Sequence, residues 1–134
     1  MSYARQMLDS YPLTFKVDAS VVAATIDALK DCAQACTADV ADDLSERDVT
    51  ELVKCIRLCL DCADVCAATA AVTTRQTEYD GNVTRPLLEV CAATCKSCSD
   101  ECERHAQMHE HCRVCAEACR RCERACRQLV AAMK

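Results

Sequence analysis

Residues 55–66 have the sequence CIRLCLDCADVC, in which Cys55, Cys59, Cys62 and Cys66 follow one another at steps of four, three and four. An α-helix advances by about 100° per residue, so these four side chains fall within about 60° of arc. A narrow stripe of this kind is typical of the helix face that packs against the axis of a helix bundle. The segment therefore predicts a helix whose buried face is made of thiols.

Steps of three and four also connect the cysteines in three further parts of the chain. All but one of the 15 cysteines form Cys-x-x-x-Cys pairs, and Cys112 is left over. The first of the four groups is the shortest, with only Cys32 and Cys36. The complete set is Cys32, Cys36, Cys55, Cys59, Cys62, Cys66, Cys91, Cys95, Cys98, Cys102, Cys112, Cys115, Cys119, Cys122 and Cys126.

Four helices are expected from this periodicity and from the capping signals between the stripes. Their expected ranges are 18–44, 45–74, 86–107 and 111–133. Long helices joined by short connections predict an all-α fold, an antiparallel up-down-up-down four-helix bundle. We expect this Cys-lined bundle at residues 18–134, preceded by a short N-terminal leader at residues 1–17.

Local signals predict where these helices begin. Asp18 is expected to cap the first helix, and residues 45–48 have the Ser-x-x-acid form of a capping box for the second. The only glycine, Gly81, lies in a stretch at residues 73–84 that is expected to form a loop. Pro86 is expected in the first turn of the third helix, where the missing N–H of proline costs little.

The composition argues against several classes of protein. One Gly and two Pro among 134 residues disfavour a β-sandwich or a Gly-rich phosphate loop. A net charge of −5, without a Lys/Arg run, disfavours nucleic-acid binding. The sequence contains no apolar run long enough to span a membrane, and its first residues lack a signal-peptide pattern. A cytoplasmic protein is therefore expected. No residue set resembles a catalytic triad or paired carboxylates, so no enzyme is expected.

The number of cysteines calls for thiol chemistry rather than ordinary packing. Buried cysteine can act as a small apolar residue, but that role accounts for one or two positions and not for four inward stripes. An odd number of cysteines and a reducing compartment both argue against a disulfide framework. Metal binding is therefore the best interpretation of the pattern.

Charge and coordination favour Cu(I) among the metals. Four thiolates around Zn²⁺ leave a charge of −2 per site, which is costly when several sites share one dry core. Cu(I) is a soft ion, and a single thiolate neutralises it. Iron–sulfur clusters usually take their four cysteines from loops. Many Cu(I) ions in the core are therefore expected, with a thiol redox protein and a zinc-buffering protein as alternatives.

The two ends of the bundle are expected to differ. At one end the third stripe continues into His105 and His109, with His111 and the unpaired Cys112 nearby. Imidazole nitrogens there suggest a mouth that accepts Cu(I) and passes it to the thiolates. Asp39, at the same end, is expected to be a solvated or capping carboxylate rather than a ligand. The other end is expected to be an apolar plug of Val22, Leu29, Ala70, Thr73, Leu87, Leu88, Val130 and Met133.

The serial cysteine pattern and the segment ERHAQMHEHC at residues 103–112 resemble the bacterial copper storage proteins, in particular their cytosolic branch. The resemblance covers residues 18–134 and implies a bundle that binds many Cu(I) ions through core thiolates. It implies that the ligands are the fifteen cysteines, with His105, His109 and His111 at the mouth. It also implies a homotetramer. Copper ions are the expected partner, with a copper chaperone as their donor.

Overall fold

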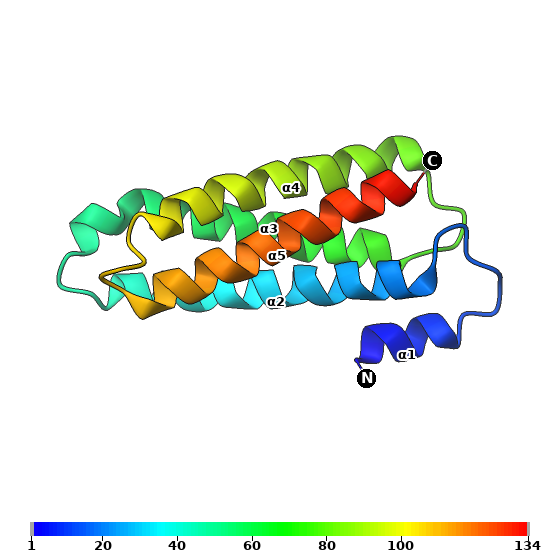
Figure 1. Cartoon of the computed structure of the whole chain (residues 1–134), viewed down its shortest axis with the longest axis horizontal. Coiled ribbons are helices and arrows are strands. Elements are labelled where there is room, and N and C mark those ends of the chain that lie inside the picture. The colour runs from blue at the N-terminus through cyan, green and yellow to red at the C-terminus, as the bar shows by residue number, and fades with distance from the viewer. Residues whose placement is uncertain (1, 134) are drawn as a thin grey trace.

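Four long helices surround a common axis in the computed structural model, which describes residues 2–133. They are α2 (Ala19–Leu44), α3 (Val53–Thr74), α4 (Gly81–Glu103) and α5 (Glu110–Ala132). Each helix packs against the next, and α5 closes the ring against α2. Successive helices run in alternating directions along the long axis (Figure 1). The predicted all-α four-helix bundle is therefore confirmed.

The first helix forms where the capping signals predict it. The Asp18 side chain accepts a hydrogen bond from the backbone N–H of Ser20 at 2.8 Å, which satisfies one of the free amide groups at the start of α2. The helix ends at Leu44, as expected.

The predicted capping box at residues 45–48 is wrong. Ser45 ends α2 instead of starting the next helix, and its hydroxyl donates to the Ala41 carbonyl at 3.1 Å. A 3-10 helix, η1 (Val49–Leu52), leads into α3. The reason is competition for partners. The Ser45 hydroxyl finds an acceptor one turn back, and the acidic side chains that follow bind histidines across the bundle, as described below.

The predicted ends of the third helix are also wrong. It begins at Gly81 because Asp80 caps it, accepting from the Asn82 N–H at 2.8 Å. Pro86 consequently lies inside α4, where it removes one amide donor near an exposed helix end. The helix ends at Glu103, and the chain then turns, with the His109 N–H donating to the His105 carbonyl at 2.9 Å. His105 therefore lies in a turn rather than on the helix.

Removing the N-cap of α4 tests how much this cap contributes to the stability of the protein. We expect Asp80→Ala to lower the free energy of unfolding by about 1 kcal/mol, because it leaves an amide group at the helix start without an acceptor. Urea denaturation of the reduced, metal-free protein measures the change. The matched control is Asp64→Ala, an exposed position within α3, which is expected to change the free energy by less than about 0.5 kcal/mol. An equal loss in both variants would contradict the capping role.

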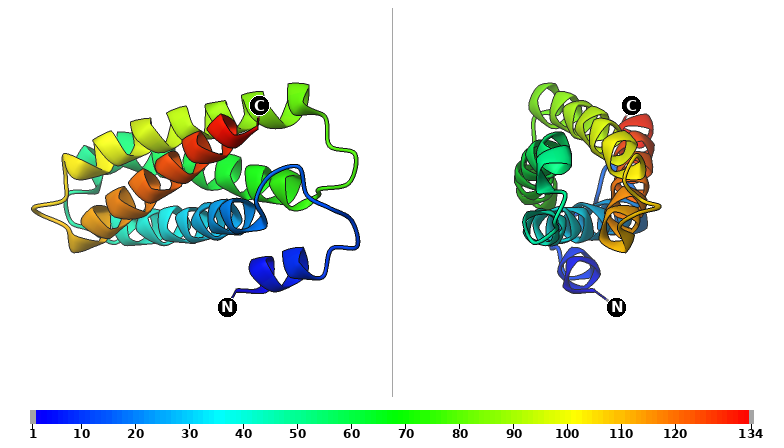
Figure 2. Two further views of the ribbon diagram at one scale, coloured as in Figure 1. Left: turned by 45° about the vertical axis from the view of Figure 1, so that its right-hand side comes forward. Right: turned by 90° about the vertical axis from the view of Figure 1, so that its left-hand side faces the viewer.

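The leader folds back on the bundle. Its short helix α1 (Tyr3–Asp9) lies outside the ring and packs on α2 through the buried Leu8 (Figure 2). The rings of Tyr11 and Phe15 stack with centroids 5.0 Å apart, and the Tyr11 hydroxyl lies 3.1 Å from Oγ1 of Thr77 in the α3–α4 connection. Within residues 2–133, no helix is both long enough and apolar enough to cross a bilayer.

Candidate metal centre

Thiols occupy most of the space that hydrocarbon side chains fill in other bundles. Every one of the fifteen cysteines is a free thiol, and each is at most 1% exposed. Two come from α2, four each from α3 and α4, and five from α5. The predicted inward stripes thus meet along the bundle axis, and all the predicted cysteine ligands lie in one core.

The sulfur atoms form a connected network across the helices. Cys59 Sγ lies 3.7 Å from the sulfurs of Cys98 and Cys102 and 3.8 Å from that of Cys115. Contacts within one helix are no shorter, since the Cys98 and Cys102 sulfurs are 4.0 Å apart. The Cys-x-x-x-Cys pairs are therefore not separate pincers. Many of the thiols are shared between neighbours on two or three helices.

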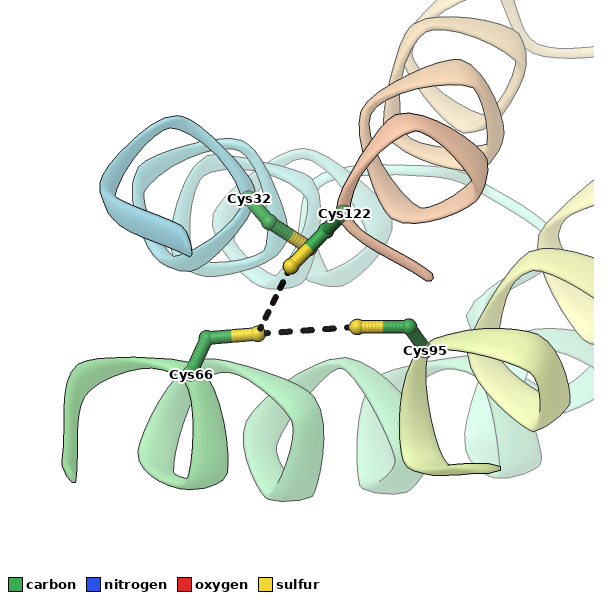
Figure 3. A group of neighbouring side chains, drawn as sticks. All are labelled: Cys32, Cys66, Cys95 and Cys122. Atoms are coloured by element: carbon green, nitrogen blue, oxygen red, sulfur yellow. Dashed lines mark hydrogen bonds between the residues drawn. The ribbon is translucent and has the colours of Figure 1, made fainter. Parts of the chain in front are cut away.

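Several groups of four sulfurs are close enough to hold metal ions. One group takes a single cysteine from each long helix, and its four sulfurs lie within 4.8 Å of one another (Figure 3). In it, Cys66 Sγ lies 3.7 Å from Cys95 Sγ and 3.9 Å from Cys122 Sγ, with Cys32 completing the set. Further groups share members with this one along the axis. Such overlap suits many soft ions of low coordination number better than a few isolated tetrahedral sites.

The thiols at both ends of the network are held in the protonated form without metal. The neighbouring Cys55 thiol and then burial raise the pKa of Cys112. The neighbours Cys122 and Cys91, followed by burial, raise the pKa of Cys126. Neutral thiols can be buried as small apolar groups, so we expect these two positions to pack without an ion. Binding a metal ion displaces the thiol protons.

The end that carries the start of α2 and the end of α5 is closed by apolar side chains. Val22, Leu29, Leu88 and Met133 are buried there, as predicted for the plug. On α5 the buried residue is Leu129, whereas the predicted Val130 is only half-buried. The Arg85 guanidinium donates to the Met133 carbonyl and fixes the end of α5 against α4.

The opposite end carries all three histidines, as predicted, but carboxylates hold them. His111 Nδ1 donates to Asp39 Oδ1 at 2.6 Å, and its Nε2 donates to Glu46 Oε2 at 2.7 Å. His109 lies 3.0 Å from Glu46 and 3.1 Å from Asp48. The two imidazole rings stack with centroids 5.2 Å apart. This group of side chains forms the mouth of the sulfur-lined core.

The three histidines come from different backbone settings. His105 lies in the turn after α4, with Nε2 3.0 Å from the buried Glu101 carboxylate. His109 is the N-cap residue of α5, and His111 lies in its first turn. The side chains are only 10–21% exposed, so they are not solvated loop residues. The expectation that His105 and His109 extend the third helix is wrong, because the chain reverses between them.

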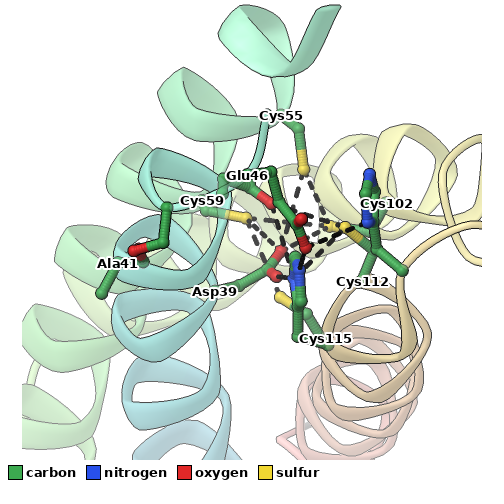
Figure 4. Close-up of polar contacts among 12 residues, drawn as sticks. Asp39, Ala41, Glu46, Cys55, Cys59, Cys102, Cys112 and Cys115 are labelled. Carbon is green, nitrogen blue, oxygen red and sulfur yellow. Dashed lines mark hydrogen bonds and ion pairs between the residues drawn. The ribbon is translucent and has the colours of Figure 1, made fainter. Parts of the chain in front are cut away.

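Asp39 corrects another expectation. It is 1% exposed and lies among thiols rather than in solvent. Its Oδ2 accepts from Cys59 at 3.4 Å and from Cys102 at 3.7 Å, so that a carboxylate caps the sulfur network (Figure 4). Burial raises the pKa of Asp39 to about 6, although the hydrogen bond from His111 opposes the shift. Burial lowers the pKa of His111, but Glu46 and Asp39 outweigh it and raise the value to about 9. The two therefore form an ion pair at neutral pH.

Asp43 was not anticipated at all, and it is 0% exposed beside Cys112. Burial, then the nearby Cys55 and Asp39, raise the pKa of Asp43 to about 8. A signal was present in the sequence. On α2 the positions 32, 36, 39 and 43 repeat the steps of four, three and four found in residues 55–66. The stripe of α2 thus continues with two aspartates where another helix has cysteines.

The architecture of thiol-lined core, closed end and histidine-bearing mouth can be compared with known proteins. The sequence profile of the copper storage protein family matches residues 18–131. The chain belongs to the copper storage protein family. The prediction of family and of copper storage is therefore confirmed.

Solved copper storage proteins share this fold. The chain is 55% identical to the copper storage protein Ccsp of Streptomyces lividans in a form loaded with 10 copper equivalents. The match covers 97% of this chain and 99% of that chain, with a TM-score of 0.95. A cytosolic copper storage protein from the same organism with five coppers is 58% identical, over 86% and 96% of the two chains, with a TM-score of 0.84.

Two more distant relatives extend the comparison. The Cu(I)-bound copper storage protein BsCsp3 is 34% identical, over 82% of this chain and 98% of that chain, with a TM-score of 0.73. The cysteine-rich protein YhjQ of Bacillus subtilis (strain 168), described as uncharacterized, is 39% identical over 93 residues. These residues are 69% of this chain and 81% of YhjQ. Structures of this family thus hold copper in the fold found for this chain.

Proposed function

We propose that this chain stores many Cu(I) ions in the cytosol, with the fifteen cysteines as ligands and without catalysis. The observation that carries the proposal is the continuous network of buried sulfurs, in which four helices contribute thiols 3.6–4.0 Å apart. The storing unit is the bundle from residue 18 to residue 134. Related cytosolic and Cu(I)-bound storage proteins support the choice of ion and compartment.

The chemistry of loading is an exchange of ions. Each Cu(I) that enters takes the place of a thiol proton, so a core with similar numbers of Cu(I) and thiolate stays close to neutral. That balance matters because the thiols are cut off from water, and unpaired charge in such a core is costly.

Titration of the reduced, metal-free protein with Cu(I) against a chromophoric chelator tests the proposal. We expect saturation near or above the number of thiols, 15. A thiol redox protein would instead form several disulfides on mild oxidation, and a zinc-buffering protein would retain Zn²⁺ in preference. Saturation at about one to four Cu(I) ions would contradict storage, because a shared sulfur network has no reason to stop there.

The histidines at the mouth are proposed to bind Cu(I) in passing and to hand it to the thiolates. His105 and His109 are held by carboxylates at the end of the bundle that has no apolar plug. Together with His111 they give Cu(I) nitrogen ligands between solvent and the first sulfurs.

Removing two of these imidazoles is expected to slow loading without changing capacity. In a His105→Ala/His109→Ala variant we expect Cu(I) uptake to slow several-fold, because the ion loses its intermediate ligands, while the stoichiometry stays the same. Stopped-flow loading from a Cu(I)–chelator complex measures the rate. The matched control is Gln107→Ala, an exposed position in the same turn. Equal rates in both variants would show that the histidines only support the turn.

A homotetramer and a copper chaperone as donor are proposed as the partners. The resemblance to the family supports the tetramer, and the outer face of α3 and α4 supports association. There a groove is lined by the apolar side chains of Leu58, Val65, Val90 and Ala93 together with polar ones that include Arg57, Asp61 and Asp64. Leu60 on α3 is 47% exposed as well. Light scattering on the eluting protein measures the assembly, and a monomer at micromolar concentration would contradict it.

A further inference from the structure

The closed end of the core contains hydroxyl groups as well as apolar side chains. On α3, Thr69 and Thr73 follow Cys66 at steps of three and four residues and continue the buried stripe toward this end. Thr25 on α2 and Thr84 on α4 extend the stripes of their own helices in the same direction. All four threonines are at most 7% exposed. Valine has a similar shape without a polar atom, so packing alone does not account for four buried hydroxyls.

One of these hydroxyls has no partner. The hydroxyls of Thr25 and Thr69 donate to carbonyls one turn earlier in their own helices, at 2.9 and 2.6 Å. Thr73 Oγ1, in contrast, is buried without a hydrogen bond to any of the described residues. A buried hydroxyl left unpaired is unfavourable, and in a native structure it calls for an explanation such as a bound water.

Thr73 lines a small cavity at the closed end, with a volume of about 20 Å³. The cavity reaches from Thr73 and Thr84 in the interior to the exposed Arg75 and the half-buried Gln76. Its remaining walls are largely apolar and include Leu129 of α5. A cavity of this size has room for one water molecule when two or more polar groups line it. The threonines and Gln76 supply such groups, so one water fits between the Thr73 hydroxyl and the surface.

Loading the core with Cu(I) creates a need for a path of this kind. Each thiolate that binds Cu(I) first gives up its proton, and a charge left behind in a core cut off from water is costly. Protons can pass between neighbouring S–H groups, and the Cys66 sulfur lies 3.8 Å from that of Cys91 and 3.9 Å from that of Cys122. A thiolate that already holds Cu(I) has no proton to pass on. Ions bound near the mouth therefore cut the deeper thiols off from an exit there.

We propose that Thr69, Thr73 and one water in the cavity form a proton outlet at the closed end of the core. The inference rests on the proposed storage of Cu(I). For each ion bound, one S–H bond breaks and one Cu–S bond forms, with no change of oxidation state. The displaced proton passes from the Cys66 thiol along the two hydroxyls to the water, and from there to bulk solvent.

The three side chains lie in line for this transfer. Residues three and four apart on a helix are neighbours, with Cβ atoms about 5–6 Å apart, which makes Thr69 the link between Cys66 and Thr73. The Thr69 hydroxyl now donates to the Val65 carbonyl, so it has to turn toward Thr73 before a proton can pass. A hydroxyl can turn in this way, and its oxygen can accept one proton while it donates another. Thr73, without a partner in the bundle, is free to bond to the water.

Stopped-flow loading with two readouts tests the outlet. The reduced, metal-free protein is mixed with a Cu(I)–chelator complex in weak buffer, where ultraviolet absorbance follows Cu–S bonds and an indicator dye follows released protons. In a Thr69→Val/Thr73→Val variant we expect the same Cu(I) stoichiometry, while the late phase of both signals slows at least threefold. Valine keeps the packing and removes the hydroxyls. Thr69→Ser/Thr73→Ser keeps the hydroxyls and loses the methyl groups, and it is expected to load at the wild-type rate.

The matched control is Thr37→Val/Thr94→Val, because these two exposed threonines also donate to the carbonyl four residues earlier. Far-UV circular dichroism checks that each variant is folded. A late phase as fast in the Thr69→Val/Thr73→Val variant as in this control would overturn the outlet, since the protons would then leave through the mouth. Equal slowing in the valine and serine variants would overturn it as well, because packing would then set the rate. A wild-type stoichiometry far below the 15 thiols would contradict storage itself, and with it the need for an outlet.

Discussion

Copper loading is expected to raise the thermal midpoint of this protein by at least about 30 °C. An ion that binds only the folded chain adds about 2.7 kcal/mol per site when its free concentration is 100 times the dissociation constant. Four such sites, far fewer than the sulfurs available, add about 11 kcal/mol. For a chain of this size, 1 kcal/mol shifts the midpoint by about 3 °C.

The metal-free protein is expected to be folded, because its buried thiols pack as neutral apolar groups between Ala-rich helices and an apolar plug. Far-UV circular dichroism of the reduced protein under nitrogen, with and without Cu(I), measures both the helix content of the metal-free protein and the rise in thermal midpoint on loading. Removal of the copper with a strong chelator is the control, and it should restore the original midpoint. A random-coil spectrum without metal would contradict the packing role of the thiols. An unchanged midpoint after loading would contradict binding to the folded state.

The helix faces could be predicted from the sequence because burial depends on periodicity. Steps of three and four residues leave only one face for a bundle axis, so every cysteine was correctly placed in the core. Helix ends could not be predicted as well. Ser45 has the right residue type for an N-cap, yet its hydroxyl donates back to the Ala41 carbonyl instead of accepting from an amide ahead of it, because local backbone groups on both sides compete for the hydroxyl.

The polar mouth was the part least open to prediction. His109 and His111 are held there by carboxylates from another segment, such as Asp48 for His109, and pairs of this kind depend on the tertiary fold. His105 pairs locally, with Glu101 one turn before it. Asp39 continues the α2 stripe, but its charge predicts a solvated side chain, because buried carboxylates are rare. The position was the better guide, because four helices that close around one axis bury every residue in the stripe.

Dividing the sulfur network near its closed end is expected to reduce copper capacity by at least about four Cu(I) ions. The group with one cysteine from each long helix lies between the mouth and the apolar plug, and its members touch thiols on both sides. Cys66, for example, lies 3.8 Å from both Cys62 and Cys91. Alanine at all four positions removes four thiolates and their charge balance. It also isolates Cys91 and Cys126 from the thiols nearer the mouth. The variant is Cys32→Ala/Cys66→Ala/Cys95→Ala/Cys122→Ala.

The stoichiometric Cu(I) titration measures the loss, and the loading curve should show a slow final phase as ions cross the gap to Cys91 and Cys126. The control carries four substitutions of exposed residues, one on each of the same helices, and should keep full capacity: Gln34→Ala, Asp64→Ala, Ser97→Ala and Gln128→Ala. Alanine leaves small cavities, so helix content is compared first by circular dichroism. If the folded core variant binds as much Cu(I) as the control, these four thiols are not copper ligands, and a storage network that includes them is contradicted. A loss limited to four ions, without the slow phase, would show that Cu(I) reaches the closed end without passing from thiol to thiol.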